Sequence, residues 1–147
     1  MIRFMRKSLI FCFALIFTSN LPAHESAPLD SGWKFQLGEA TNAEQTSFND
    51  AAWQAVSIPH CWGWQEAQQG NTNYYRGPGW YRRDLEIQPQ KGKRYFLRFE
   101  AAGSVADVYL NGGLIGEHRG AFGAFCFEIT TNLSAGGTNL LGNPGQH

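Results

Sequence analysis

The chain has 147 residues, enough for one domain with its own hydrophobic core. Twelve Lys and Arg residues balance twelve Asp and Glu residues. The absence of a basic stretch argues against nucleic acid as a partner, because phosphate binding depends on clustered cations. Seventeen glycines and an aromatic content of 14% are typical either of a β-rich fold with many turns or of a carbohydrate-binding surface.

The first residues have the pattern of a secretory signal peptide. Arg3, Arg6 and Lys7 precede a short apolar run over residues 8–17, and a small residue, Ala23, follows at a suitable cleavage distance. The apolar run is short for a membrane span, which disfavours the alternative of an uncleaved anchor. We therefore expect residues 1–23 to direct the chain to the periplasm or out of the cell.

Two cysteines remain after this segment, Cys61 and Cys126. An oxidising compartment permits a disulfide between them, but we expect two unpaired, mostly buried thiols instead. The histidines are scattered and do not pair with either cysteine at the spacing of metal ligands, so no metal site and no cofactor are predicted.

From residue 31 onward the sequence predicts short strands, each with alternating apolar and polar residues between turn-forming residues. On residues 80–87, Tyr81 and Leu85 fall on one face and Arg82 on the other. Asn111 and Gly112 predict a type I′ hairpin turn, and residues 47–53 are compatible with one helical turn. The other predicted strands are 33–37, 55–58, 94–100, 105–110 and 125–129. This pattern predicts an all-β sandwich or jelly roll.

The end of the sequence departs from this pattern. Residues 136–141, "GGTNLL", begin a further strand, but Gly142, Pro144 and Gly145 are poor residues for continuing a central strand. We expect residues 142–147 to form an irregular tail, and the chain to be truncated there.

The motifs, read in order, resemble the N-terminal sugar-binding domain of glycoside hydrolase family 2, which includes β-galactosidases, β-glucuronidases and β-mannosidases. They are "SGWKFQLG", "SFNDAAWQAVSIPHCW", "NYYRGPGWYRRDL" and "VADVYLNGGLIGEHRGAFGAFCFEIT". The resemblance covers residues 29–141 and implies a galactose-binding-domain-like jelly roll. It also implies an immunoglobulin-like domain and a (β/α)₈ barrel downstream, both absent from this chain.

The resemblance places the catalytic glutamates in the barrel, so no catalytic residue is assigned here. Glycoside hydrolysis needs two carboxyl groups flanking the bond, about 5 Å apart when configuration is retained. None of the candidate glutamates stands in a motif like the catalytic ones of the family. These candidates are Glu66, Glu86, Glu100, Glu117 and Glu128.

The stretch "NTNYYRGPGW", residues 71–80, combines aromatic rings with amide and guanidinium donors, which suits a sugar. The resemblance implies that the loop before it reaches toward the sugar site of the barrel. We therefore assign Asn73, Tyr74 and Arg76 as substrate-binding candidates, with Phe122 on a second rim over residues 119–125.

Alternatives to these roles remain open. Arg76 can instead pair with a carboxylate such as Asp107 and order its loop. Tyr75 and Trp80 are interpreted as structural, Tyr81 as core, and His60 as a local hydrogen-bonding residue. Packing in a hairpin is the alternative role for Phe122.

Three functions are compatible with the sequence. The first is the sugar-binding domain, as a fragment, of an exported family 2 hydrolase that acts on β-galactoside-like or β-glucuronide-like substrates, the carbohydrate being its ligand. The second is a free-standing, non-catalytic carbohydrate-binding module. The third is a structural or adhesive sandwich.

Overall fold

The computed structural model describes residues 24–62, 68–70, 75, 77–121 and 123–146. In this part of the chain the regular elements are eight β-strands, which are short and separated by turns. They are β1 (Trp33–Leu37), β2 (Gln54–Val56), β3 (Gly79–Leu85), β4 (Phe96–Phe99), β5 (Val105–Leu110), β6 (Gly113–Arg119), β7 (Phe125–Glu128) and β8 (Asn139–Gln146).

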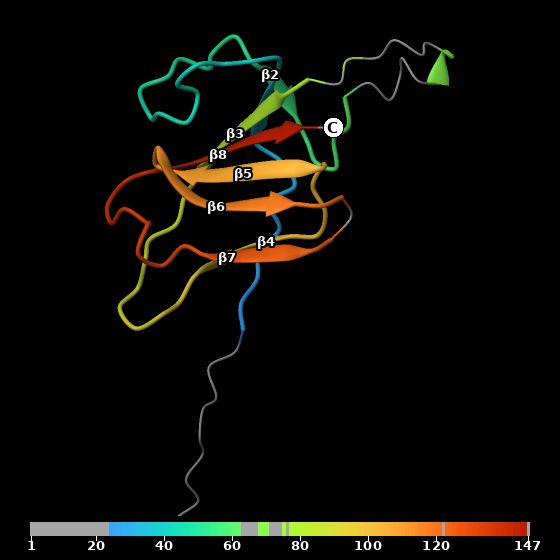
Figure 1. The fold of residues 1–147 in the computed structure, drawn as a ribbon. Helices are drawn as coiled ribbons and strands as arrows, with labels where there is room; N and C mark the ends of the chain where they lie inside the picture. Colours follow the sequence, from blue (N-terminus) through green and yellow to red (C-terminus); the bar gives the residue numbers. More distant parts are fainter. Residues whose placement is uncertain (1–23, 63–67, 71–74, 76, 122, 147) are drawn as a thin grey trace, which may run out of the picture.

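The strands form two antiparallel sheets. The large sheet has six strands in the order β2-β1-β3-β8-β5-β6, and β4 pairs with β7 in a second, two-stranded sheet. Figure 1 shows the two-stranded sheet beside the β5–β6 end of the large sheet. This all-β arrangement agrees with the predicted jelly-roll sandwich.

The core lies between the two sheets. Strands of the large sheet contribute Trp33, Leu85, Val108, Leu110 and Leu141, and the opposite layer contributes Leu97 and Ile129. Leu97 is buried whereas the neighbouring Phe96 is 51% exposed, as the alternation of residues 94–100 predicts.

The turn between β5 and β6 has the predicted chemistry. Asn111 and Gly112 both have positive φ, at 54° and 85°, as a type I′ turn requires. The Asn111 side chain also donates hydrogen bonds to Asn132 O and to Asn139 Oδ1, and its oxygen accepts one from the Leu140 amide. One turn residue therefore ties the hairpin to the start of β8.

The expectation that residues 142–147 form an irregular tail is wrong for residues 142–146. Strand β8 continues to Gln146 and lies in the middle of the large sheet, between β3 and β5. Pro144 is tolerated because the β5–β8 ladder is interrupted opposite Asp107 and Val108 and resumes at Ala106. The strand continues past the gap because its pairing with β3 runs without a break from Asn139 to Gly145.

One smaller expectation also changed. Residues 47–53 form turns, with Trp53 N–H donating to Asp50 O, rather than a helical turn. Among the residues that the structure describes, no helix is long and apolar enough to cross a membrane.

Candidate functional site

Strand pairing brings several connecting segments to one end of the large sheet, here called the loop end. Gly79, Gly145, Ala106 and His118 lie in register on four neighbouring strands, from β3 through β8 and β5 to β6. The segment before Gly79 and the segment after β6 therefore leave the sheet at the same end. We call the segment before Gly79 the first rim and the segment after β6 the second rim. With strands about 4.8 Å apart, the two rims leave the sheet roughly 14 Å from each other.

A cluster of four rings forms the base of the first rim. The Phe35 ring stacks on Trp62 with centroids 5.5 Å apart and also packs against His60 at 4.7 Å and Tyr81 at 4.8 Å. Tyr81 comes from β3, immediately after the segment, and His60 and Trp62 come just before it. The cluster thus holds together the two ends of the stretch that carries the predicted sugar contacts.

His60 and Tyr81 also form a polar pair inside this cluster. The His60 Nδ1 atom lies 2.8 Å from the Tyr81 hydroxyl. Burial lowers the pKa of His60 and raises the pKa of the Tyr81 phenol. Both groups are therefore neutral near pH 7, and the 2.8 Å contact confirms the local hydrogen-bonding role expected for His60. Tyr81 is partly buried and packs against the core.

The second rim rests on another stack of rings. His118 lies flat against Phe125, with centroids 4.1 Å apart, and Phe125 stacks on Phe99 at 4.7 Å. The Nε2 atom of His118 lies 2.9 Å from Gly120 O, which orients the ring toward the turn. The stack fixes the start and the end of the second rim, residues 119–125.

The four predicted sugar-contacting residues, Asn73, Tyr74, Arg76 and Phe122, lie outside the described residues. Two of their neighbours, Tyr75 and Trp80, lie within the described residues. Trp80 is 8% exposed and packs near Tyr109, as its structural role requires. Tyr75 is 38% exposed, with its ring directly over Gly77.

Asp107, the predicted alternative partner of Arg76, has a buried carboxylate oxygen. Its Oδ1 atom accepts no hydrogen bond from the part of the chain that the structure describes. Because Arg76 lies outside that part, the pairing stays a prediction.

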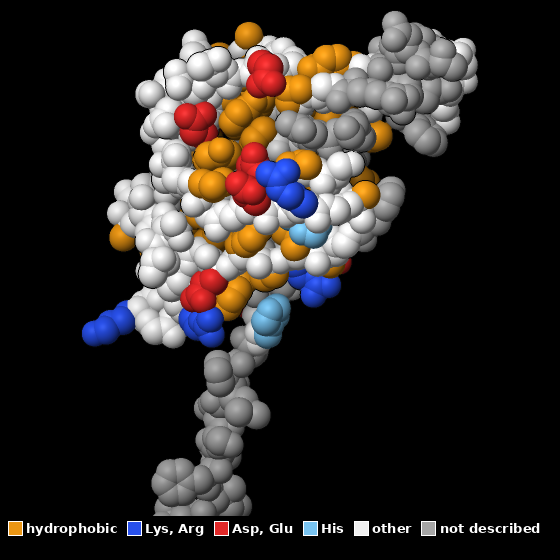
Figure 2. Space-filling view, in the orientation of Figure 1, with side chains coloured by type: hydrophobic (Ala, Val, Ile, Leu, Met, Phe, Trp, Pro, Cys, Tyr) orange, Lys and Arg blue, Asp and Glu red, His pale blue; other side chains and the backbone are white. Residues whose placement is uncertain are grey.

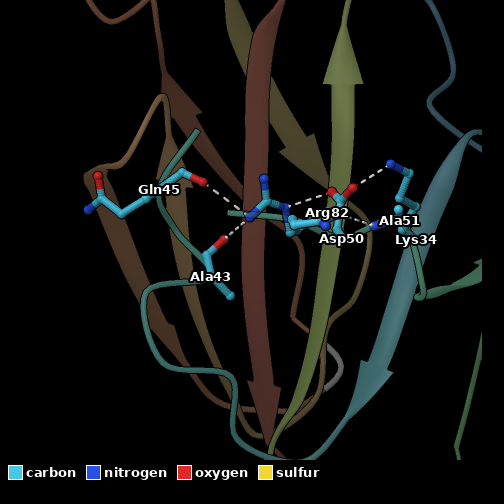
Figure 3. A network of polar contacts seen from close by, with 7 residues as sticks. Lys34, Ala43, Gln45, Asp50, Ala51 and Arg82 are labelled. Atoms are coloured by element: carbon cyan, nitrogen blue, oxygen red, sulfur yellow. Dashed lines mark hydrogen bonds and ion pairs between the residues drawn. The ribbon is translucent and has the colours of Figure 1, made fainter. Parts of the chain in front are cut away.

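A buried charge network that the sequence did not reveal lies on the outer face of the large sheet, away from the core. Arg82, placed there only as a polar residue of β3, is 2% exposed. Its Nε atom lies 3.0 Å from Asp50 Oδ2, and Lys34 binds the other oxygen of the same carboxylate. Its Nη1 atom donates to Ala43 O at 2.6 Å and to Gln45 O at 3.2 Å (Figure 3).

These contacts hold residues 39–53, here called the strap, across the outer face of the sheet. Phe48 and Trp53 of the strap lie 5.2 and 5.8 Å from the Arg82 guanidinium carbon. The signal that could have revealed this is "FNDAAW", in which two aromatics flank an aspartate. Large apolar residues around an acid favour a covered ion pair over a solvated loop.

Three of the glutamates considered as catalytic candidates, Glu100, Glu117 and Glu128, lie in surface ion pairs. Arg94 binds Glu128 through two hydrogen bonds of 3.0 and 2.6 Å, and this contact lowers the pKa of Glu128 to about 2. Glu100 pairs with Arg98, and Glu117 with Arg119. Glu66 lies outside the described residues, and Glu86 is exposed.

Cys61 and Cys126 are both unbridged and exposed. The expectation that unpaired thiols would be mostly buried is therefore wrong. Cys61 directly precedes Trp62 in the chain, and Cys126 lies on the outward side of the two-stranded sheet, alternating with Phe125 and Phe127. On the face seen in Figure 2, acidic and basic side chains lie singly or in small groups among apolar ones.

Comparison with known proteins supplies the family. Residues 45–142 match the model of the glycosyl hydrolase 2 galactose-binding domain-like family. The chain is 40% identical over 133 residues to a β-glucuronidase of Bacteroides fragilis, covering 89% of this chain and 18% of that protein. It is 30% identical over 105 residues to a β-galactosidase of Thermoanaerobacter pseudethanolicus, covering 71% of this chain and 14% of that protein.

A solved structure agrees. Bacteroides uniformis β-glucuronidase 2 superposes with a TM-score of 0.73 and 41% identity, over 79% of this chain and 14% of that one. The chain therefore spans less than a fifth of the length of these relatives. The eight-stranded sandwich and the match over two thirds of its residues lead to one conclusion: this chain belongs to the glycosyl hydrolase 2 galactose-binding domain-like family.

Proposed function

We propose that this chain is the N-terminal, non-catalytic sugar-binding domain of an exported family 2 glycoside hydrolase acting on β-glucuronide-like or β-galactoside-like substrates. The observation that carries the proposal is the 40% identity to a β-glucuronidase, which extends over nearly the whole chain and a small part of the relative. Similarity of that extent is typical of one domain in a larger enzyme.

The loop end supports a role in presenting residues to a sugar. The rings of Phe35, His60, Trp62 and Tyr81 fix both ends of the segment that contains Asn73, Tyr74 and Arg76. A rigid base reduces the entropy lost when a loop is ordered around a ligand. In this proposal the segment completes a sugar site whose catalytic carboxylates belong to the downstream barrel.

The surface ion pairs of Glu100, Glu117 and Glu128 support the assignment of catalysis to another domain. An acid/base catalyst has a raised pKa, whereas Glu128 has a lowered one. Export is proposed from residues 1–23, whose charged start and apolar run have the signal-peptide pattern.

The test combines the coding DNA downstream of codon 147 with an activity assay. We expect barrel-encoding sequence downstream, and we expect the purified 147-residue chain not to hydrolyse 4-nitrophenyl β-D-glucuronide or the corresponding galactoside. A stop codon with no barrel sequence beyond it would favour the free-standing module. Hydrolysis by the chain alone, lost on replacing one of its glutamates by glutamine, would contradict the proposal.

A further inference from the structure

A second site lies on the outer face of the large sheet, away from the loop end. The strap and the sheet border an open groove of about 280 Å³, near the lower limit of small-molecule sites. Its lining includes Lys34, Thr46, Arg82, Asp84, Thr138 and Leu140. The groove is thus bounded by the strap, by β1 and β3, and by the start of β8.

The floor of the groove contains a buried guanidinium that has a free hydrogen-bond donor. The Arg82 side chain is 3% exposed, and its Nε and Nη1 atoms contact Asp50, Ala43 and Gln45. No described residue accepts a hydrogen bond from its Nη2 atom, and Figure 3 shows the remaining terminal nitrogen pointing away from these partners. A fixed donor of this kind is already oriented for a ligand.

The walls of the groove supply acceptors and hydroxyl groups. The side chains of Asp84, Thr46 and Thr138 are exposed, and within the described ranges they have no hydrogen-bond partner. Phe48 adds an aromatic ring beside the guanidinium. The groove therefore offers a cation donor, a carboxylate acceptor, two hydroxyls and one ring.

The charges of the lining select the class of ligand. Lys34 and Arg82 are both neutralised in part by Asp50, which they share, and Asp84 adds a second negative charge. The four charges sum to zero, so an anionic ligand gains little electrostatic binding free energy. Asp84 also repels a carboxylate. A lining that holds both donors and acceptors matches the hydroxyl groups of a sugar, each of which both donates and accepts.

We propose that this groove is a second carbohydrate site, which binds one neutral pyranose unit independently of the loop end. Arg82 Nη2 donates to one sugar hydroxyl, Asp84 accepts from its neighbour, and the threonines contact the remaining hydroxyls. Such a site holds a sugar unit other than the reacting one, which the loop end serves in the proposed function.

The proposal is tested by nuclear magnetic resonance on the ¹⁵N-labelled full chain, titrated with methyl β-D-galactopyranoside. We expect saturable shifts at the amides of Thr46, Asp84 and Thr138, and weaker binding of sodium glucuronate. Asp84→Asn and Thr138→Val each weaken binding by roughly tenfold, the effect of one lost hydrogen bond. Glu86→Gln, an exposed change just beyond β3, is the matched control and leaves the dissociation constant unchanged.

The wild-type titration tests the proposal on its own, even if one variant fails to fold. Both substituted side chains are exposed, so we expect the variants to fold. The absence of saturable shifts in the groove overturns the proposal. Shifts confined to the loop end also overturn it, while supporting the proposed function. Tighter binding of glucuronate than of the galactoside would contradict the assignment to a neutral sugar.

Discussion

Gly79 and Gly145 lie directly opposite each other on β3 and β8, and the Trp62 ring rests on both. A Cβ atom at Gly145 would lie 3.3 Å from Trp62 Cη2, and one at Gly79 would lie 3.4 Å from the same atom and 2.9 Å from Phe35 Cε2. Two adjacent glycines thus make a flat seat for the indole. The seat positions the start of the segment that carries the predicted sugar contacts.

Adding a methyl group to this seat tests its packing. We expect Gly79→Ala to lower the free energy of unfolding by about 1–3 kcal/mol, the usual cost of overpacking, and Gly145→Ala to lower it less. Urea denaturation followed by tryptophan fluorescence measures both. Gly137→Ala is the control, because a Cβ there meets nothing within 4 Å. Equal losses of stability at all three glycines would contradict the close packing of Trp62 on Gly79 and Gly145.

Removing the buried guanidinium tests the strap. We expect Arg82→Met to lower the free energy of unfolding by about 3 kcal/mol, because Asp50 loses a buried partner and the Ala43 and Gln45 carbonyls lose their donor. Arg98→Met is the matched control: Arg98 and its partner Glu100 are 66% and 80% exposed, and such pairs contribute less than about 1 kcal/mol. Similar losses in the two variants would refute a special role for Arg82.

The pair between Arg94 and Glu128 makes a prediction about pH. Hydrogen bonds from Arg94 and then Thr130 lower the pKa of Glu128 from 4.5 to about 2. Because the folded-state pKa is depressed, the stabilisation is present above pH 4.5 and is lost as the pH falls toward 2. The pair is exposed, so the measured quantity is the pKa itself, from ¹³C carboxyl shifts.

Arg94→Gln should raise the pKa of Glu128 while leaving it below 4.5, since the Thr130 hydroxyl still donates to the carboxylate. The same substitution at Arg98 serves as the control and leaves Glu128 unchanged. An unshifted Glu128 in the wild-type chain would show that the ion pair does not form in solution.

Because β8 lies in the middle of the large sheet, we expect the fold to depend on the last residues of this strand. Deleting residues 142–147 removes the pairing partners of Gly79, Trp80, Tyr81 and Arg82 from the middle of the large sheet. We expect this variant to lose cooperative thermal unfolding, monitored by near-ultraviolet circular dichroism. Deleting only His147, which lies beyond β8, should leave the transition unchanged. Cooperative unfolding of the longer deletion at the wild-type temperature would contradict the central position of this strand.

The sequence predicts the local features of the fold well. Alternation located the strands of Trp33–Leu37 and Val105–Leu110 without error, and Asn111 with Gly112 identified the type I′ turn. These features depend on residues close together in the chain, so composition and period are sufficient.

The remaining features depend on contacts between distant residues. Pro144 looks unsuitable for a central strand until the gap in its ladder with β5 is known. The polar face of β3 looks solvated until the strap is seen to cover Arg82. The predicted sugar contacts are a different case: all four lie outside the described residues, and no contact here tests them.

The central claim is that the loop end serves a glycosidase, and a chimera measures this most directly. The matching N-terminal region of the Bacteroides fragilis β-glucuronidase is replaced by this chain, and kcat/KM is measured for 4-nitrophenyl β-D-glucuronide. We expect an active chimera whose kcat/KM falls by roughly tenfold or more when Asn73, Tyr74 and Arg76 are replaced together by alanine, with the melting temperature unchanged. An active chimera whose kcat/KM is insensitive to the triple substitution would contradict the claim.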